Sequence, residues 1–141
     1  MTSYDIIYKR FLNKITDFNL QDLDDFTMND MFKEWMKTAI VNVRTSKRGI
    51  FLKRDDENEM FDEDLGDLNI ELLAIGMTLA WLDQQLNSTE VTRTFIGGKE
   101  EKLFSPSKHL AELRERRNQI VQEMHRLYTY DTYTNNEYFK Q

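Results

Sequence analysis

Hydrophobic residues recur every three or four positions in two stretches of the first half of the chain, as in an amphipathic α-helix. Ser3 is suited to cap the first helix, whose apolar positions are Ile6, Ile7, Phe11, Leu12 and Ile15. The second helix follows Thr27 and Asp30, which resemble a capping box, and its apolar stripe is Met28, Phe32, Trp35, Met36, Ala39, Ile40 and Val43. We expect segment 17–26 to be a connector that tucks Phe18, Leu20 and Leu23 onto a neighbouring element.

The helical pattern then gives way to a long charged segment over 44–67. Its first part is basic and its second part is acidic, with eight Asp and Glu residues between positions 55 and 67. Segment 49–52 is either a short strand or an apolar anchor, and Phe61 with Leu65 forms a second anchor. A loop of this length in a small domain is usually functional.

The third predicted helix, over 68–86, is apolar in nearly every direction around its axis, which is typical of an element buried on all sides. It begins near Asp67 or Asn69, and Asn87 with Ser88 is expected to stop it. Ser88 is then suited to cap a further short helix over 89–95, which Gly97 and Gly98 would end.

The fourth helix is predicted over 107–128, with Ser105 and Pro106 at its start. It carries a seam of residues spaced alternately three and four apart, namely Leu110, Leu113, Arg117, Ile120, Met124 and Leu127. Such a seam packs against a neighbouring helix. Arg117 within it is costly unless paired, and both a subunit interface and an ion pair within the chain satisfy it.

The last residues, 129–141, are polar with interspersed aromatic rings at Tyr130, Tyr133, Tyr138 and Phe139. We interpret them as an extended C-terminal tail suited to contact a partner. The fold class is therefore predicted to be all-α, a small bundle of about four main helices in a single domain over 1–128, with a long charged loop and this tail. The seam and the four aromatic residues are the candidate interface.

Composition narrows the class of protein. At 141 residues the chain is long enough for one domain, and it has no cysteine, which excludes disulfides and thiolate chemistry. A net charge of −6 argues against a general nucleic-acid binder. The first residues lack the pattern of a signal peptide, and the longest apolar run, over 72–82, is shorter than the roughly 20 residues that span a bilayer, so we expect neither export nor a membrane location.

The residues give no support for a catalytic, metal or cofactor site. The acidic run fails the spacing of a calcium loop, because Phe61 falls where the first Asp is needed. His109 and His125 lie about 160° apart around one helix and cannot share a metal. Asp83, which follows Trp81 and Leu82, is the nearest to a carboxylate in an apolar setting and is interpreted as a helix-end residue. We therefore expect no enzymatic activity.

Several segments are similar in type and order to small structural proteins of tailed bacteriophages, in particular the head-tail connector, or adaptor, proteins of the neck. They are Phe11–Asp17, Trp35–Ile40, Phe61–Leu65, Ile70–Leu86, and Phe104–Leu110 leading to Tyr128–Asp131. The resemblance spans most of the chain, although the charged segment 44–67 as a whole has no assigned counterpart.

The resemblance implies a virion protein without enzymatic activity that forms a homo-oligomeric ring beneath the portal protein and supports neighbouring neck or tail proteins. DNA would pass through its channel without specific binding, which suits an acidic subunit. The protein would be made in the host cytoplasm and reside in the virion neck. A second hypothesis is a small acidic regulatory or inhibitory protein that binds a host factor through its acidic segment.

Overall fold

The computed structural model describes residues 1–15, 25–43, 48–96 and 106–135. Their helices are α1 (Tyr4–Lys14), α2 (Asp25–Asn42), α3 (Gly66–Ile96) and α5 (Pro106–Asn135), with a 3-10 turn η1 (Arg48–Phe51). Three short strands, β1 (Thr2–Ser3), β2 (Arg54–Asp55) and β3 (Met60–Phe61), form a small antiparallel sheet in the order β1-β3-β2. The all-α prediction is confirmed, with this sheet as an addition.

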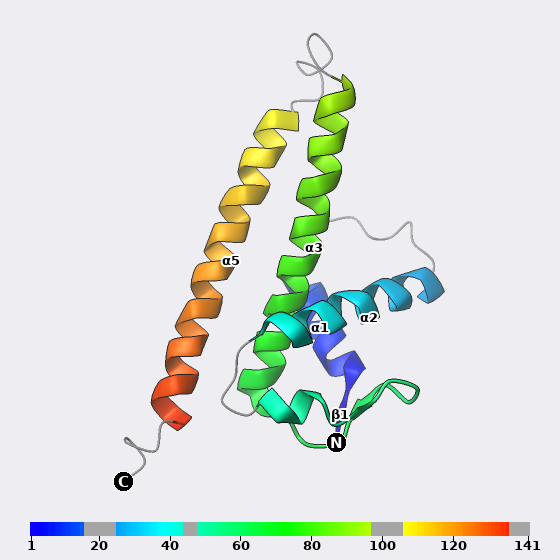
Figure 1. Cartoon of the computed structure of the whole chain (residues 1–141), viewed down its shortest axis with the longest axis vertical. Helices are drawn as coiled ribbons and strands as arrows, with labels where there is room; N and C mark the ends of the chain where they lie inside the picture. Colours follow the sequence, from blue (N-terminus) through cyan, green and yellow to red (C-terminus); the bar gives the residue numbers. More distant parts are fainter. Residues whose placement is uncertain (16–24, 44–47, 97–105, 136–141) are drawn as a thin grey trace.

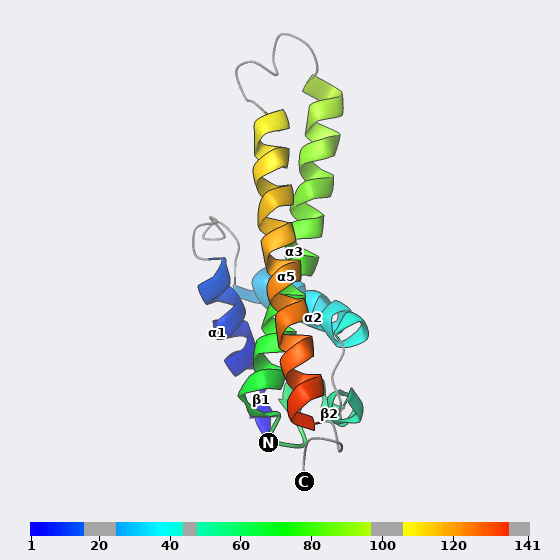
Figure 2. The ribbon, with the colours of Figure 1, turned by 90° about the vertical axis from the view of Figure 1, so that its left-hand side faces the viewer.

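The central helix α3 organises the molecule. α5 runs antiparallel beside it, while α1 and α2 pack against the first half of α3 (Figures 1 and 2). The last turns of α3 and the first turns of α5 extend beyond α1 and α2 as a two-helix arm. The molecule therefore has a broad base, made of α1, α2 and the sheet, and a narrow arm.

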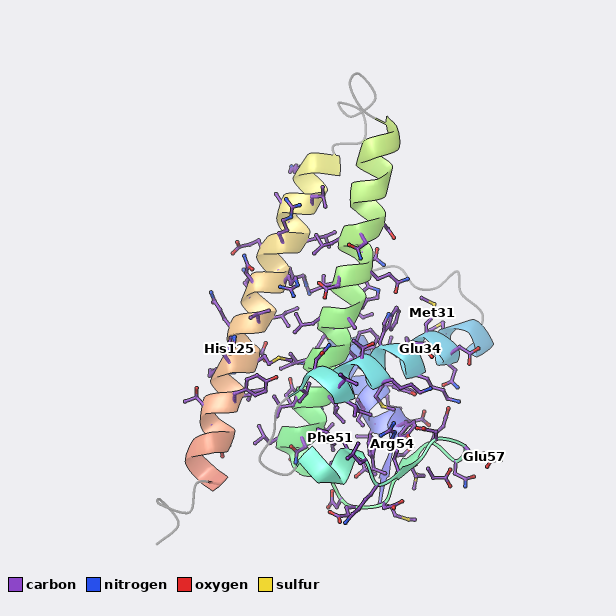
Figure 3. The ribbon with its side chains drawn as sticks, viewed as in Figure 1. Met31, Glu34, Phe51, Arg54, Glu57 and His125 are labelled. Carbon is purple, nitrogen blue, oxygen red and sulfur yellow. The ribbon has the colours of Figure 1, made fainter. Side chains whose placement is uncertain are left out.

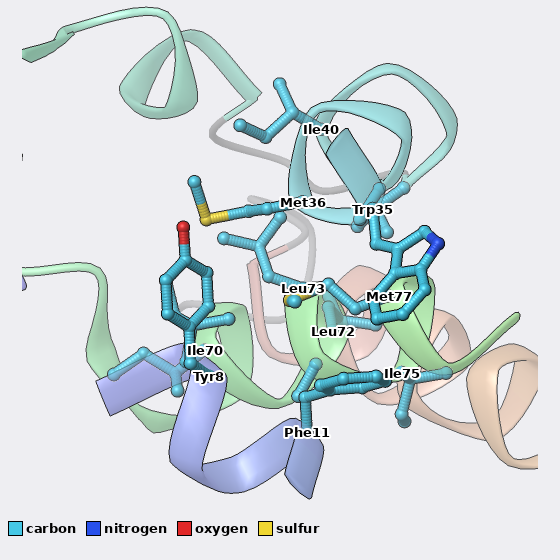
Figure 4. Close-up of a cluster of buried hydrophobic side chains, with 14 of the residues drawn as sticks. Tyr8, Phe11, Trp35, Met36, Ile40, Ile70, Leu72, Leu73, Ile75 and Met77 are labelled. Atoms are coloured by element: carbon cyan, nitrogen blue, oxygen red, sulfur yellow. The ribbon is translucent and has the colours of Figure 1, made fainter. Parts of the chain in front are cut away.

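The core surrounds the middle of α3, as the apolar pattern predicts. Residues 72–78 of α3 are all buried, and at Gly76 the packing is so close that an added Cβ would clash with Ala39 and Val43. Figure 4 shows α3 side chains such as Leu73 and Met77 enclosed by Phe11 of α1 and Trp35 of α2. Side chains on nearly all sides of α3 are buried because α1, α2 and α5 each cover a different side of this helix.

Helix α1 starts as predicted but turns a partly different face inward. Ser3 is its N-cap, and the Ser3 hydroxyl accepts a hydrogen bond from the Asp5 N–H at 3.3 Å. Ile6 remains 47% exposed, whereas Tyr4 and Tyr8 are buried. Ile6 lies outside the buried face because two tyrosines fill the side of α1 that meets the sheet and α2.

Helix α2 buries the predicted stripe, with Phe32, Trp35, Met36, Ala39, Ile40 and Val43 all in the core. It begins at Asp25, so Thr27 lies within the helix and the predicted capping box was wrong. Phe18, Leu20 and Leu23, predicted to tuck onto a neighbour, lie outside the described residues.

The ends of two helices differ from the prediction. α3 continues through Asn87 and Ser88 to Ile96, because these residue types cost a helix only a few tenths of a kcal/mol each and do not break it as proline does. Asp83 is therefore not a helix-end residue. α5 continues to Asn135, so residues 129–135 are helical rather than extended, and the remainder of the predicted tail lies outside the described residues.

The charged segment is folded over residues 48–67, where it forms η1 and the hairpin of β2 and β3. Both predicted anchors are confirmed, since Phe51, Phe61 and Leu65 are buried. Phe61 of β3 is opposite Thr2 of β1, and the Tyr4 N–H donates to the Glu59 carbonyl at 2.9 Å. The N-terminus thereby fastens this segment to the base.

Candidate interaction surface

The seam predicted on the fourth helix packs within the chain, where α5 meets α3. Leu110, Leu113 and Met124 are buried, and Ile120 and Leu127 are partly buried against the core. These side chains attach α5 to α3 and to the core of the molecule. A role for them at a subunit interface stays a prediction.

The charged position in the seam is paired inside the chain. The Arg117 Nε–H donates to Asp83 Oδ1 on α3 across 2.7 Å. Of the two alternatives that the sequence leaves open for Arg117, the intrachain ion pair is the one present in the structure.

The aromatic positions of the predicted interface are only partly described. Tyr130 lies on α5 and is 57% exposed. The side chain of Tyr133, and the residues Tyr138 and Phe139, lie outside the part of the chain that the structure describes.

Tyr130 borders a groove at the base of the molecule, which we call the basal groove. The groove has a volume of about 610 Å³ and is lined by Arg10 of α1, by Asp67, Leu68 and Glu71 of α3, and by Arg126, Leu127 and Tyr130 of α5. Its lining combines apolar and charged side chains, as protein-binding surfaces do. It is a candidate docking site among the described residues.

Some of the charged side chains around the basal groove form ion pairs within the chain, whereas one does not. Arg10 Nη1 lies 3.5 Å from Glu71 Oε2, Arg10 Nη2 lies 3.7 Å from Asp67 Oδ1, and Lys14 also pairs with Glu71. Arg126 is exposed and has no ion pair or side-chain hydrogen bond with any described residue. The groove therefore presents one cation that a partner can pair.

On the other side of the base, the hairpin between β2 and β3 ends in an acidic tip, residues 55–58. Asp55 Oδ1 accepts hydrogen bonds from the Glu57 N–H at 3.0 Å and from the Asn58 N–H at 3.1 Å, and Asp55 Oδ2 accepts from Asn58 Nδ2 at 2.6 Å. These bonds lower the pKa of Asp55. They also fix the turn, which points Glu57 outward (Figure 3).

Glu59 closes the tip in a strained conformation. Its φ is +57°, in the left-handed region that residues other than glycine seldom occupy. The carboxylate accepts a hydrogen bond from Asn29 Nδ2 at 3.0 Å and pairs with Lys33 Nζ at 3.0 Å, which lowers the pKa of Glu59 and raises that of Lys33. Two contacts from α2 thus hold the tip in place.

The acidic tip is also tied to α1. The Tyr4 hydroxyl donates to Asp56 Oδ1 at 2.6 Å, and Arg54 Nε donates to the same oxygen at 3.2 Å. Burial, reinforced by this contact with Asp56, raises the pKa of Tyr4, and the hydrogen bond from Tyr4 lowers that of Asp56. The acidic tip is therefore a rigid projection.

The described residues contain no cluster of three or more His, Asp or Glu side chains able to hold a metal ion. Over the same residues, none of the helices is both long enough and apolar enough to cross a membrane. The His125 ring makes an edge contact with Tyr128 on the same helix.

Comparisons of the chain with family models, with curated proteins and with solved structures find no match. The surfaces described above therefore rest on the chain's own geometry.

Sequence reasoning found the aromatic Tyr130 but missed the basal groove and the acidic tip. The groove is formed by three helices that are distant in sequence, so periodicity gives no sign of it. The tip had a local signal, because Asp55 followed three residues later by Asn58 is typical of a turn closed by an Asp side chain. The pattern of Asp55 and Asn58 was hard to recognise in the sequence because the segment contains many other acidic residues.

Proposed function

We propose that this chain is a structural, ring-forming subunit of the neck of a tailed bacteriophage, a head-tail connector that docks under the portal protein and joins the capsid to the tail. The observation that carries the proposal is the combination of a broad helical base with the two-helix arm of α3 and α5. A base with a groove on one side and a projection on the other suits lateral packing in a ring, and an arm suits contact with an adjacent ring. The similarity of the chain's segments to connector proteins adds support.

The distribution of charge is consistent with a channel for DNA. The chain carries a net charge of −6, and Asp62, Glu63 and Asp64 are exposed at the base. Like charges repel a passing DNA duplex and prevent it from adhering. In this role the subunit binds the portal protein and neighbouring neck or tail proteins, is made in the host cytoplasm and resides in the virion neck.

Light scattering and electron microscopy of the purified full chain, alone and mixed with portal particles, test the proposal. We expect a discrete oligomer with a central channel, or rings seated on the portal. A chain that stays monomeric alone and also fails to bind portal or tail components would contradict it.

A second candidate function is a small acidic regulatory protein that binds a host factor. The rigid acidic tip favours it, because a preorganised projection loses little entropy on binding. Copurification with a single host enzyme, and absence of the chain from purified virions, would support this function. Its presence in virions at the copy number of a ring would reject it.

A further inference from the structure

We infer that subunits of this protein join head to tail, with the acidic tip of one subunit inserted in the basal groove of the next and Glu57 paired with Arg126. This inference rests on the proposed ring and names the two surfaces that close it. The occupant of the groove is therefore a second copy of this chain.

The groove is suited to a projecting acidic turn. Leu68, Leu127 and Tyr130 give the groove an apolar part, and Arg126 lines it without an ion pair to any described residue. Arg10, the other arginine in the groove, is already engaged with Asp67 and Glu71. Arg126 is thus the group through which an anionic partner gains a new ion pair.

The acidic tip is suited to enter the basal groove. Glu57 is exposed at the outer end of the hairpin, and its carboxylate makes no hydrogen bond or ion pair with the described part of the chain. The turn is held by Asp55 from within and by Asn29 and Lys33 through Glu59 from α2. A projection fixed in this way needs little reorganisation to bind.

The two surfaces are placed so that repeated contacts can close into a ring. Figure 3 shows Glu57 on one side of α3 and His125, which directly precedes Arg126, on the other. Both surfaces belong to the lower half of the molecule, and the arm points away from the hairpin (Figure 1). A contact between two different surfaces of the same chain is a heterologous interface, and such interfaces form rings when the rotation between successive subunits closes.

Charge also argues for head-to-tail contact rather than for two tips meeting. The tip, residues 55–58, has three acidic residues and no basic residue, so two tips facing each other would repel. Arg126, in the groove on the other side of the base, carries a positive charge. The complementary pair of surfaces is present within one chain.

A charge exchange tests the pairing. Glu57→Arg and Arg126→Glu, each alone, should weaken self-association by about tenfold or more, because a close interface charge pair contributes at least that much. The double variant should regain most of the lost association. Glu112→Arg, an exposed site on α5 outside the basal groove, is the matched control and should leave association unchanged. Mass is measured by light scattering, on the free chain or on portal particles if rings form only there, and thermal melts verify that each variant folds.

Cross-linking gives an independent measurement, because the chain has no cysteine of its own. Glu57→Cys and Arg126→Cys variants are mixed and treated with a short thiol cross-linker. We expect a covalent dimer in the mixture and little in either variant alone, since each contact needs one residue of each kind.

The outcomes separate this inference from the proposed function. Rings that form normally in both single charge variants, without a cross-link in the mixture, would overturn the tip-in-groove contact and leave the connector proposal standing. A chain that never associates, alone or with portal, would overturn both. Restored association in the double variant together with the mixed cross-link would support both.

Discussion

Arg117 on α5 and Asp83 on α3 form an ion pair across 2.7 Å between the two helices of the arm. Both side chains are partly exposed, at 39% and 52%. The pair lies in the apolar seam between α3 and α5, at the one seam position that is charged. Arg117 is thereby accommodated without a partner subunit.

The Arg117 pair should contribute little to stability. An exposed ion pair is worth about 0 to 1 kcal/mol, so Arg117→Met should change the free energy of unfolding by no more than about that amount, because Met also fills the seam. Urea unfolding of the wild type, Arg117→Met, Asp83→Asn and the double variant measures the coupling. Unchanged stability with a changed oligomeric mass would show that Arg117 also acts at an interface.

Gly76 should resist replacement, because α2 crosses α3 closely at this point. A Cβ at position 76 would lie 2.7 Å from Ala39 Cβ and 2.8 Å from Val43 Cγ2. Gly76→Ala should lower the free energy of unfolding by about 1 to 2 kcal/mol, since overpacking outweighs the gain in helix propensity. Gly49→Ala, where no atom lies within 4 Å of the added Cβ, is the control. Equal or higher stability of Gly76→Ala would mean that α2 and α3 cross less closely than described.

The buried hydroxyl of Thr2 should be needed to hold the charged segment on the base. It donates to the Glu63 carbonyl at 3.0 Å and accepts from the Leu65 N–H at 3.1 Å. Thr2→Val keeps the shape but leaves both groups unpaired, which should cost about 1 to 3 kcal/mol in thermal or urea unfolding. Thr2→Ser retains the hydroxyl and should lose much less. Similar losses in the two variants would show that the methyl group, rather than the hydrogen bonds, stabilises this region.

Lowering the pH should destabilise the hairpin, because Glu59 and Asp56 become protonated. Contacts with Asn29 and Lys33 lower the pKa of Glu59, and contact with Tyr4 lowers that of Asp56. A carboxyl group with a lowered folded-state pKa stabilises the fold above its unfolded pKa, and this stabilisation is lost as the pH falls through the folded value. The free energy of unfolding should therefore decrease as the pH falls below about 5.

The Glu59→Gln variant isolates one of these carboxyl groups. It should be less stable than the wild type at neutral pH, and this difference should shrink as the pH falls below the usual carboxyl range. Glu112→Gln on α5 provides the matched control. A difference between Glu59→Gln and the wild type that does not change with pH would show that the ionised state of Glu59 does not matter.

The local pattern of the sequence was sufficient for much of the fold. The all-α class, the burial of residues 72–78 and the stripe of α2 follow from periodicity, because a helix displays its apolar positions on faces that are fixed by its own geometry. The Ser3 cap and the anchors Phe51 and Phe61 were also readable, since each depends on the type of residue and its immediate neighbours.

The tertiary structure alone decided what each face meets. The sequence identified a seam on α5 but not that α3 would cover it, and it left Arg117 with two alternatives that only the position of Asp83 resolves. It could not pair Thr2 with Glu63 and Leu65, nor gather Arg10, Leu68 and Arg126 around one groove. Periodicity is a property of neighbouring residues, whereas these contacts join residues from distant parts of the chain and exist only once the helices have packed.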